Sequence, residues 1–443
     1  MKKLKTRYVC QECGYASVKL YGRCPSCGSW NSMVEEVESP KVQSVPSTSE
    51  PIPLHMWEEV KEERRSSGFP ALDQALGGGL VLGQVVLIAG EPGIGKSTLL
   101  LQVCDRFSKE EGPVLYVSGE ESGRQISLRA KRLNIRSENL YLYTETNLSK
   151  IVQAIQNMRP SLVVIDSIQT IHSELLESSA GSVAQVRECA FKIAEVCKGL
   201  EIPVFIVGQI TKEGSIAGPK VLEHLVDTVL SFEGERFNFY RVVKVVKNRF
   251  GSVGEMAVFR MTDAGLEEVL EPSAFFLQER VKAPGSVVFP YTEGSKPVLV
   301  EVQALTVDAL YTTPQRKTQG FDVNRLALIL AILEKEVKIF TRDKDVFINV
   351  VGGLSLREPA VDLAVALSVV SSVKNKAIED AIIFGELGLA GEVRAVHFSD
   401  IRLKEALRFG FKKAIVPKGS MVEVEGMEIY PVSSIKEAVE LLF

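Results

Sequence analysis

The sequence predicts an α/β protein in three parts: a small N-terminal module, a central domain built on a parallel β-sheet, and a second α/β domain. Three observations predict this fold class. Near-continuous apolar runs alternate with helical segments, as in a parallel sheet that is covered on both faces. A glycine-rich loop follows the first run directly, and two C-x-x-C pairs lie within the first 33 of 443 residues. The central apolar runs are residues 85–89, 114–117, 162–165 and 204–207.

Four of the seven cysteines form two pairs near the N-terminus, Cys10 with Cys13 and Cys24 with Cys27. A glycine follows each pair, and four thiolates at this spacing suit tetrahedral Zn²⁺. A segment of about 35 residues could not build a core without a metal. The alternatives are a disulfide pair or a redox motif, which a reducing cytosolic setting disfavours. We therefore expect a zinc ribbon over residues 1–33.

Residues 34–53 are rich in Ser, Pro, Glu and Val without sustained periodicity, which is typical of a linker. We expect the parallel-sheet domain at residues 54–270 and the C-terminal domain at residues 271–443. The remaining cysteines lie in apolar or helical sequence, where they are expected to be small buried hydrophobes. They are Cys104, Cys189 and Cys197.

The glycine-rich loop is a complete G-x-x-x-x-G-K-[ST] motif between a predicted strand and a predicted helix, the order that a phosphate-binding loop requires. Its glycines let consecutive backbone N–H groups curl around phosphate oxygens, and Lys96 supplies charge to the β and γ phosphates. Ser97 or Thr98 can bind Mg²⁺ at the positive end of the helix. The sequence thus predicts binding of a nucleoside triphosphate with Mg²⁺. The loop residues are Gly90, Glu91, Pro92, Gly93, Ile94, Gly95, Lys96, Ser97 and Thr98.

Acidic and amide side chains end the neighbouring strands. Asp166 follows the third apolar run, from which a carboxylate can hold the Mg²⁺ water shell opposite the phosphate loop. Glu120 and Glu121 follow the second run, and one of them could polarise the attacking water. Either could instead cap the helix that starts near Gly123, and this interpretation is favoured for Glu121. We therefore prefer Glu120 as the carboxylate that polarises the water. Gln209 ends the fourth run with an amide that could sense the γ-phosphate.

A basic pair with i, i+2 spacing, Lys247 and Arg249, follows the strand-like run 242–246. In an extended segment both side chains point to the same side. Such a pair could reach the γ-phosphate of a neighbouring subunit and stabilise charge in the transition state, as arginine fingers do. On the residues alone, a solvated strand end is an equally good interpretation.

The four-cysteine knuckle, the phosphate-binding loop and the string Lys-Asn-Arg-Phe-Gly at residues 247–251, in this order, resemble the bacterial RadA (Sms) family of DNA repair proteins over essentially the whole chain. The resemblance implies a RecA-like core that hydrolyses ATP, assembles into a hexameric ring, binds single-stranded and branched DNA and drives branch migration with RecA. By comparison with DnaB-type motors, it implies that Glu120 is the catalytic glutamate and Gln209 the sensor. It also implies that Lys247 and Arg249 act in trans.

Beyond residue 270, strand-like runs at 298–302, 346–350 and 382–384 and helical spacing at 325–336 and 360–372 indicate a separate α/β domain. This region resembles the proteolytic domain of Lon, with two departures. Ala360 stands where Lon carries its nucleophilic serine, and Asp400 stands at or next to the position of its catalytic lysine. Because nucleophile and base are both missing, we expect a scaffold for ring assembly that could also contact DNA, and no protease.

DNA contact is expected to be local, because the net charge of the chain is -4. Residues 1–33 carry six Lys and Arg side chains against the single acid Glu12, so the phosphate affinity of this module should depend on salt. Lys212 and Lys220 follow the fourth apolar run, in a segment where RecA-like motors thread single strands. We expect them to contact DNA phosphates.

No apolar run approaches the roughly 18 residues needed to span a membrane. The basic N-terminus is followed by polar residues and not by an apolar signal core, so we expect a cytoplasmic protein without membrane contact. The leading hypothesis is a DNA-stimulated ATPase and helicase of recombinational repair. The alternatives are an ATP-dependent protease, which the missing serine disfavours, and a nucleotide-switched DNA clamp that unwinds nothing. Motor and clamp need the same phosphate loop, so the sequence does not separate them.

Overall fold

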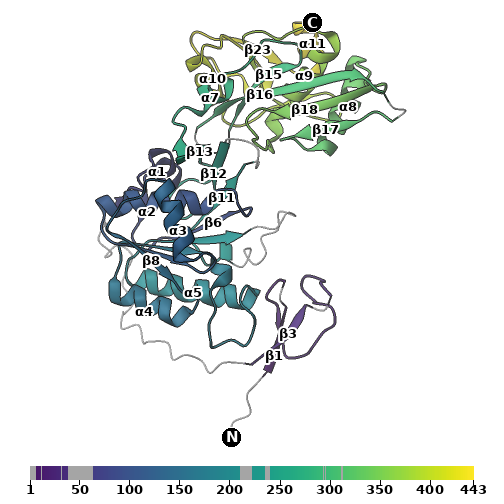
Figure 1. Cartoon of the computed structure of the whole chain (residues 1–443). Helices are drawn as coiled ribbons and strands as arrows, with labels where there is room; N and C mark the ends of the chain where they lie inside the picture. The colour runs from purple at the N-terminus through teal and green to yellow at the C-terminus, as the bar shows by residue number, and fades with distance from the viewer. Residues whose placement is uncertain are drawn as a thin grey trace, which may run out of the picture. The chain divides into compact units, whose positions relative to one another are not determined.

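The computed structural model of the chain describes residues 6–10, 12–30, 32–37, 63–209, 222–234, 240–292, 294, 296–310 and 313–443 (Figure 1). The chain divides into two compact units after Glu268, two residues before the boundary that we expected at residue 270. The first unit contains a small N-terminal sheet and a large sheet, and the second has a sheet of its own. Within these ranges, no helix is long and apolar enough to cross a bilayer.

The N-terminal module is an antiparallel sheet of three strands in the order β2-β1-β3. The N–H of Gly14 donates to the carbonyl of Cys10, and the N–H of Gly28 donates to the carbonyl of Cys24, both at 2.9 Å. Both glycines have a positive φ, which glycine adopts without strain. The strands are β1 (Thr6–Cys10), β2 (Ala16–Ser17) and β3 (Met33–Val37).

The last strand of this module runs beyond the boundary that we expected for it. Since β3 pairs with β1 as far as Val37, the sheet extends past residue 33, where we expected the linker to begin. Residues 38–53 of the expected linker lie outside the described residues.

The large sheet has nine strands in the order β14-β13-β12-β11-β6-β10-β9-β7-β8. Its strands from β8 to β11 along this order are parallel, whereas β12 runs antiparallel to β11 and β14 antiparallel to β13. A short antiparallel pair, β4 (Arg64–Arg65) and β5 (Leu80–Val81), lies outside this sheet. The nine strands are β6 (Val85–Gly90), β7 (Val114–Ser118), β8 (Leu140–Thr144), β9 (Leu162–Asp166), β10 (Val204–Gln209), β11 (Thr228–Glu233), β12 (Tyr240–Asn248), β13 (Met256–Thr262) and β14 (Gly265–Glu268).

Helices cover both faces of the parallel strands (Figure 1), as the apolar runs predicted. Because side chains alternate along a strand, Val86 and Ile88 of β6 pack with α1 and α2, whereas Val85 and Leu87 pack in a separate core with α4 and α5. The helices of this unit are α1 (Pro70–Leu76), α2 (Lys96–Glu110), α3 (Gly123–Arg132), α4 (Leu148–Met158) and α5 (Val183–Gly199).

Polar residues at the starts of three helices explain where these helices begin. The side chains of Ser122, Asn147 and Ser182 each accept a hydrogen bond from the backbone N–H three residues later, at the starts of α3, α4 and α5. Such N-caps satisfy backbone donors that have no partner inside the helix. The helix predicted near Gly123 therefore begins where its sequence signal places it.

The second unit is a mixed sheet of seven strands in the order β17-β18-β16-β15-β19-β22-β23. The helix expected at 360–372 starts at Asp362, because a 3₁₀ turn, Pro359–Val361, precedes it. The sheet strands are β15 (Ser286–Tyr291), β16 (Val298–Asp308), β17 (Arg316–Gln319), β18 (Lys344–Val350), β19 (Ala381–Ile383), β22 (Lys413–Pro417) and β23 (Glu428–Val432). A separate pair is β20 (Glu386–Leu387) and β21 (Val393–Arg394), and the helices are α7 (Pro272–Leu277), α8 (Val323–Val337), α9 (Asp362–Lys374), α10 (Ser399–Arg408) and α11 (Ile435–Leu442).

Candidate nucleotide site

The carboxyl ends of four adjacent parallel strands, β6, β10, β9 and β7, meet at one edge of the large sheet. A cleft of about 260 Å³ lies at this edge. The cleft brings together side chains that the sequence singled out on four separate segments, because parallel strands present their ends on the same side. They are Lys96, Ser97, Thr98, Glu120, Glu121, Asp166 and Gln209.

The phosphate-binding loop connects β6 directly to α2, so the helix N-terminus faces the cleft. Gly93 and Gly95 have positive φ values of 79° and 120°. A Cβ at Gly90 would lie 2.6 Å from the carbonyl oxygen of Phe232, so the strand end has no room for a side chain. These glycines allow the tight turn that exposes backbone N–H groups to an anion.

Lys96 is buried, and its Nζ donates to the carbonyls of Gly90 at 2.7 Å and Glu91 at 2.8 Å. Burial lowers the pKa of the Lys96 ammonium, and the nearby carboxylates of Asp166 and Glu120 act in the opposite direction. The lysine is therefore held against the loop that surrounds the cleft, within reach of the place where phosphates would lie.

Glu120 and Gln209 contact each other, although 89 residues separate them in the chain. The Gln209 Nε2 donates to the Glu120 Oε1 at 2.8 Å, and the hydroxyl of Ser167 donates to the same oxygen. The hydroxyl of Tyr116 donates to Asp166 Oδ2. Burial and the Asp166 charge raise the pKa of Tyr116, so its phenol stays protonated as a donor. Sequence reasoning did not identify Ser167 or Tyr116.

Glu121 points to a different partner from Glu120. Its Oε1 accepts a hydrogen bond from the Nη2 of Arg129, a residue of α3. Arg129 and Arg132 both line the cleft, and sequence reasoning missed both. Their signal was the basic last turn of α3, the helix that the sequence predicted to start near residue 123. The ion pair of Glu121 with a cation distinguishes the two glutamates in a way that their adjacent positions could not.

Lys247 and Arg249 do not line this cleft. Asn248, which lies between them, pairs with Thr228, and Thr228 pairs with Val86 at the amino end of β6. The phosphate loop begins four residues later, roughly 13 Å further along the strand. Within one subunit, the two cations and the phosphate loop therefore lie at opposite ends of the sheet.

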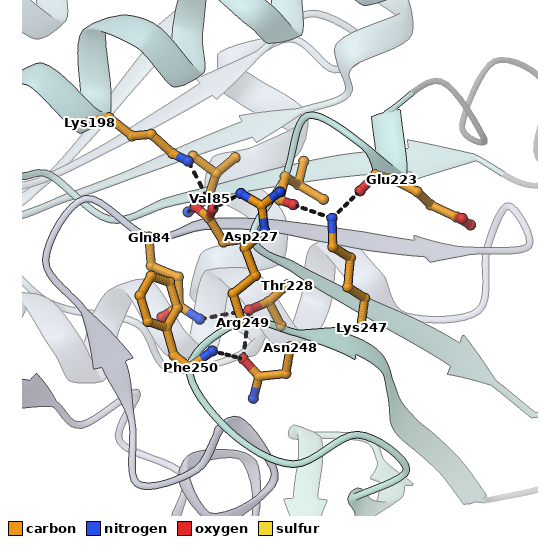
Figure 2. A network of polar contacts seen from close by, with 11 residues as sticks. Gln84, Val85, Lys198, Glu223, Asp227, Thr228, Lys247, Asn248, Arg249 and Phe250 are labelled. Atoms are coloured by element: carbon orange, nitrogen blue, oxygen red, sulfur yellow. Dashed lines mark hydrogen bonds and ion pairs between the residues drawn. The ribbon is translucent and has the colours of Figure 1, made fainter.

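Both cations contact the same turn before β11 (Figure 2). The Lys247 Nζ donates to the carbonyl oxygens of Glu223 and Val226, and Arg249 Nη1 lies 3.2 Å from Asp227 Oδ1. The i, i+2 spacing thus places both side chains on one side. Burial and the neighbouring Arg249 charge lower the pKa of Lys247.

The four N-terminal cysteines lie together with a geometry that fits a metal. Their sulfur atoms all lie within 4.8 Å of one another, with Cys10 Sγ and Cys27 Sγ 3.6 Å apart and Cys13 Sγ and Cys24 Sγ 3.6 Å apart. Tetrahedral Zn²⁺ with Zn–S bonds of about 2.3 Å would require sulfur separations of about 3.8 Å. Hydrogen bonding with the side chain and backbone of Ser29 lowers the pKa of the Cys27 thiol to about 6, which favours the thiolate that binds metal.

Family models match three stretches of the chain: a rubredoxin metal binding domain at residues 8–35, an AAA domain at residues 50–215, and subunit ChlI of Mg-chelatase at residues 326–420. The DNA repair protein RadA of Aquifex aeolicus is 68% identical over 447 residues, which cover 100% of both chains. This chain belongs to the RadA family of DNA repair proteins. The RadA proteins of Halalkalibacterium halodurans and Bacillus subtilis are each 46% identical, with at least 98% of each chain covered. A solved KaiC-like protein of Pyrococcus horikoshii OT3 matches 47% of this chain and 99% of its own, with 21% identity and a TM-score of 0.40.

Membership of the RadA family confirms the resemblance that the motifs indicated, and the α/β fold with an N-terminal zinc ribbon is confirmed with it. The AAA domain makes the core a nucleotide-binding ATPase domain, and its nucleotide implies Mg²⁺. The rubredoxin-type match and the four clustered thiolates support Zn²⁺ in the ribbon.

The two residues at which this chain departs from Lon both lie in the second unit. Ala360 is buried in the 3₁₀ turn before α9, and Asp400 lies in the first turn of α10. Arg402, two residues after Asp400, is buried and donates to both carboxylate oxygens of Glu358, two residues before Ala360, with the shorter contact at 2.5 Å. Lys212 and Lys220, the expected DNA contacts of the RadA core, lie outside the described residues.

Proposed function

We propose that this RadA family member is a DNA-dependent ATPase and helicase. It binds single-stranded and branched DNA and promotes branch migration of recombination intermediates with RecA. The observation that carries the proposal is the contact of Glu120 with Gln209 in the same cleft as Lys96 and Asp166. Hydrolysis of a γ-phosphate uses a side chain that orients the attacking water. The Glu120 carboxylate, held by the Gln209 amide beside the phosphate loop, can do this.

In this proposal, backbone N–H groups of the loop and Lys96 hold the β and γ phosphates. The hydroxyl of Ser97 and the carboxylate of Asp166 hold Mg²⁺ and its water shell, and the ion, when bound, neutralises charge on the phosphate oxygens. Glu120 orients the attacking water, because its carboxylate lies in the cleft while Glu121 is engaged by Arg129. Gln209 contacts Glu120 and can report the state of the γ-phosphate to the strand that carries it.

The second part of the proposal is that Lys247 and Arg249 complete the site of a neighbouring subunit in a hexameric ring. Their position at the end of the sheet opposite the phosphate loop supports this, since they cannot reach the nucleotide of their own chain. A cation supplied in trans stabilises the charge that develops on the transferred phosphoryl group.

A mixing experiment tests the shared site. We expect Arg249→Ala to bind ATP nearly normally and to hydrolyse it at least about 10³-fold more slowly, as in known arginine fingers. Lys96→Ala should also be inactive, for a different reason. Mixed rings should regain activity, because an intact phosphate loop can then lie beside an intact Arg249. No regain of activity in mixtures shown to co-assemble would contradict the shared site.

Strand displacement separates the motor from the clamp. Forked DNA with a single-stranded tail should be unwound with ATP and left intact with a nonhydrolysable analogue, and RecA should increase the rate of branch migration on joint molecules. If DNA binding depended on nucleotide while no strand was displaced under any condition, the nucleotide-switched clamp would replace the helicase as the function.

A further inference from the structure

A buried carboxylate, Asp227, lies at the centre of the contacts around Arg249 (Figure 2). Its Oδ1 accepts from the Nζ of Lys198 at 2.8 Å and lies 3.2 Å from the Nη1 of Arg249. Its Oδ2 accepts from the backbone N–H of Val85 at 3.0 Å. One carboxylate thus contacts α5, the end of β12 and the start of β6.

The backbone of Asp227 strengthens the same links. Its N–H donates to the carbonyl of Val85 at 2.9 Å, and its carbonyl accepts from the N–H of Arg249 at 3.1 Å. Val85 is the first residue of β6, the strand that ends in the phosphate loop. Asp227 therefore connects Arg249, through two contacts on each side, to the strand that carries its own subunit's phosphate loop.

The exposed fractions of the three charged side chains would allow Arg249 to bind an anion while Asp227 stays buried and paired. The Asp227 side chain is 4% exposed, whereas that of Arg249 is 54% exposed and that of Lys198 is 42% exposed. In the described parts of the chain, Asp227 is the one side chain that pairs with the Arg249 guanidinium. Lys198 would still compensate the buried carboxylate if Arg249 also bound an anion, so such binding would leave no unpaired buried charge.

We propose that Asp227 is a positioning residue for ATP hydrolysis, which orients Arg249 toward the γ-phosphate of the neighbouring subunit. This inference rests on the shared site proposed above. A guanidinium is a planar fork with five donors, so one nitrogen held by a carboxylate fixes the plane in which the others meet phosphate oxygens. Asp227 also contacts Val85, the first residue of β6. The orientation of the Arg249 guanidinium is therefore fixed relative to β6.

The substitution Asp227→Asn tests the role, because it removes the charge and keeps an acceptor for the N–H of Val85. We expect kcat to fall by about 10-fold to 100-fold with KM for ATP unchanged, since a misplacement of about 1 Å can cost 100-fold in rate. Lys198→Ala is the matched control, because it removes the other partner of Asp227 and leaves the contact with Arg249. An unchanged kcat in Asp227→Asn would overturn the inference.

A second measurement separates positioning from a structural defect in the phosphate loop of the same chain. Asp227→Asn subunits keep their own phosphate loop, so mixing them with Lys96→Ala subunits should restore activity. The double variant Asp227→Asn with Arg249→Ala should be no slower than Arg249→Ala alone. A further loss in the double variant, or no regain on mixing where Arg249→Ala does regain activity, would overturn the role of Asp227 and leave the shared site intact.

The reference mixture of Arg249→Ala with Lys96→Ala separates failure of the shared site from failure of the positioning role of Asp227. If that mixture also stays inactive in co-assembled rings, the shared site itself fails and Asp227 has no Arg249 role to play. Should Asp227→Asn not fold, Asp227→Glu replaces it. The variant keeps the charge, lengthens the side chain by one methylene and so displaces the carboxylate from Arg249, and the same mixing criterion applies to it.

Discussion

At the scale of single residues, Lys96 illustrates a functional side chain whose contacts are confined to its own loop. Its Nζ donates to the carbonyls of Gly90 and Glu91, and its charge lies near Asp166 and Glu120. The energy of placing an ammonium in this buried position is offset in part by those carbonyls and carboxylates. Removing the amine therefore affects the charge of the cleft more than the packing of the core.

We expect Lys96→Ala to abolish ATP hydrolysis and to leave the fold intact, because it removes one charge from the phosphates and no core contact. Turnover measured with single-stranded DNA, and a melting curve of the variant, check both parts. Lys109→Ala is a control on the same helix, since Lys109 pairs with Asp105 and is half exposed. Normal turnover in Lys96→Ala would contradict the assignment of the loop.

The adjacent acids give a second prediction at this scale. Glu120→Gln should lower kcat by about 100-fold or more, because the carboxylate that contacts Gln209 and Ser167 would no longer act on the attacking water. Glu121→Gln should have a smaller effect, since it weakens the ion pair with Arg129 only. Single-turnover rates at saturating ATP compare the two variants, and equal losses would remove the reason for preferring Glu120.

At the scale of elements, the turn after β12 shows why the Lys-Asn-Arg-Phe-Gly string contains more than its cations. Asn248 Oδ1 accepts from the hydroxyl of Thr228 and from the N–H of Phe250, while its Nδ2 donates to the carbonyl of Leu76. A Cβ on Gly251 would lie 2.9 Å from that Nδ2, so only glycine fits without a shift. The uncharged residues of the string thus hold the turn that presents Lys247 and Arg249.

The zinc ribbon is an element that its apolar residues cannot stabilise. Its buried apolar cluster consists of Cys10, Cys24 and Met33, with Tyr8 and Cys13 packed against it. Two of its three buried members are themselves predicted zinc ligands. Since so little apolar area is buried, the metal must supply most of the folding free energy of this module.

Accordingly, we expect Cys24→Ser to release zinc and to unfold the ribbon while the ATPase core keeps its melting temperature. Metal content by a stoichiometric assay and the melting curve of the full chain measure these effects. Trp30→Ala serves as the control, because Trp30 is exposed and the variant keeps all four thiolates. Full zinc content in Cys24→Ser, or early melting of the whole chain, would show that the ribbon is not an independent metal-dependent element.

At the scale of the whole molecule, the second unit carries Ala360 and Asp400 at the two positions where we expected the nucleophile and base of a Lon-like protease to be missing. Ala360 offers no nucleophilic atom, and the nearby polar side chains Glu358 and Arg402 are engaged with each other. Arg402 also donates to the carbonyl of Pro290 on β15. The pair therefore connects α10, the turn before α9 and the sheet, which is a structural role.

We expect casein or another unfolded protein to stay intact when it is incubated with ATP, DNA and this chain. The physical reason is that Ala360 cannot attack a carbonyl and Asp400 cannot act as the lysine base. Gel analysis after long incubation is the measurement. Cleavage that persists through repurification and follows the protein on a sizing column would require a different catalytic pair.

Much of the central domain could be predicted from local pattern. The apolar runs became β6, β7, β9 and β10, because strands buried on both faces must be apolar at every position. The ends of elements differ more from the prediction. The strand β3 continues to Val37, past the expected end of the ribbon at residue 33, and α9 starts at Asp362 and not at residue 360. These shifts follow from sheet pairing and from Pro359, which local composition registers only weakly.

The sequence by itself determined which residues can do chemistry: the phosphate-binding loop and the four cysteines follow from residue type and spacing, and the missing serine at Ala360 follows from the resemblance to Lon. Only the tertiary structure decided which of these residues meet. It paired Glu120 with Gln209 and Glu121 with Arg129, and placed Asp227 between Arg249 and β6. The physical reason is that strand order in a sheet brings together segments far apart in the chain, and no local pattern encodes that order.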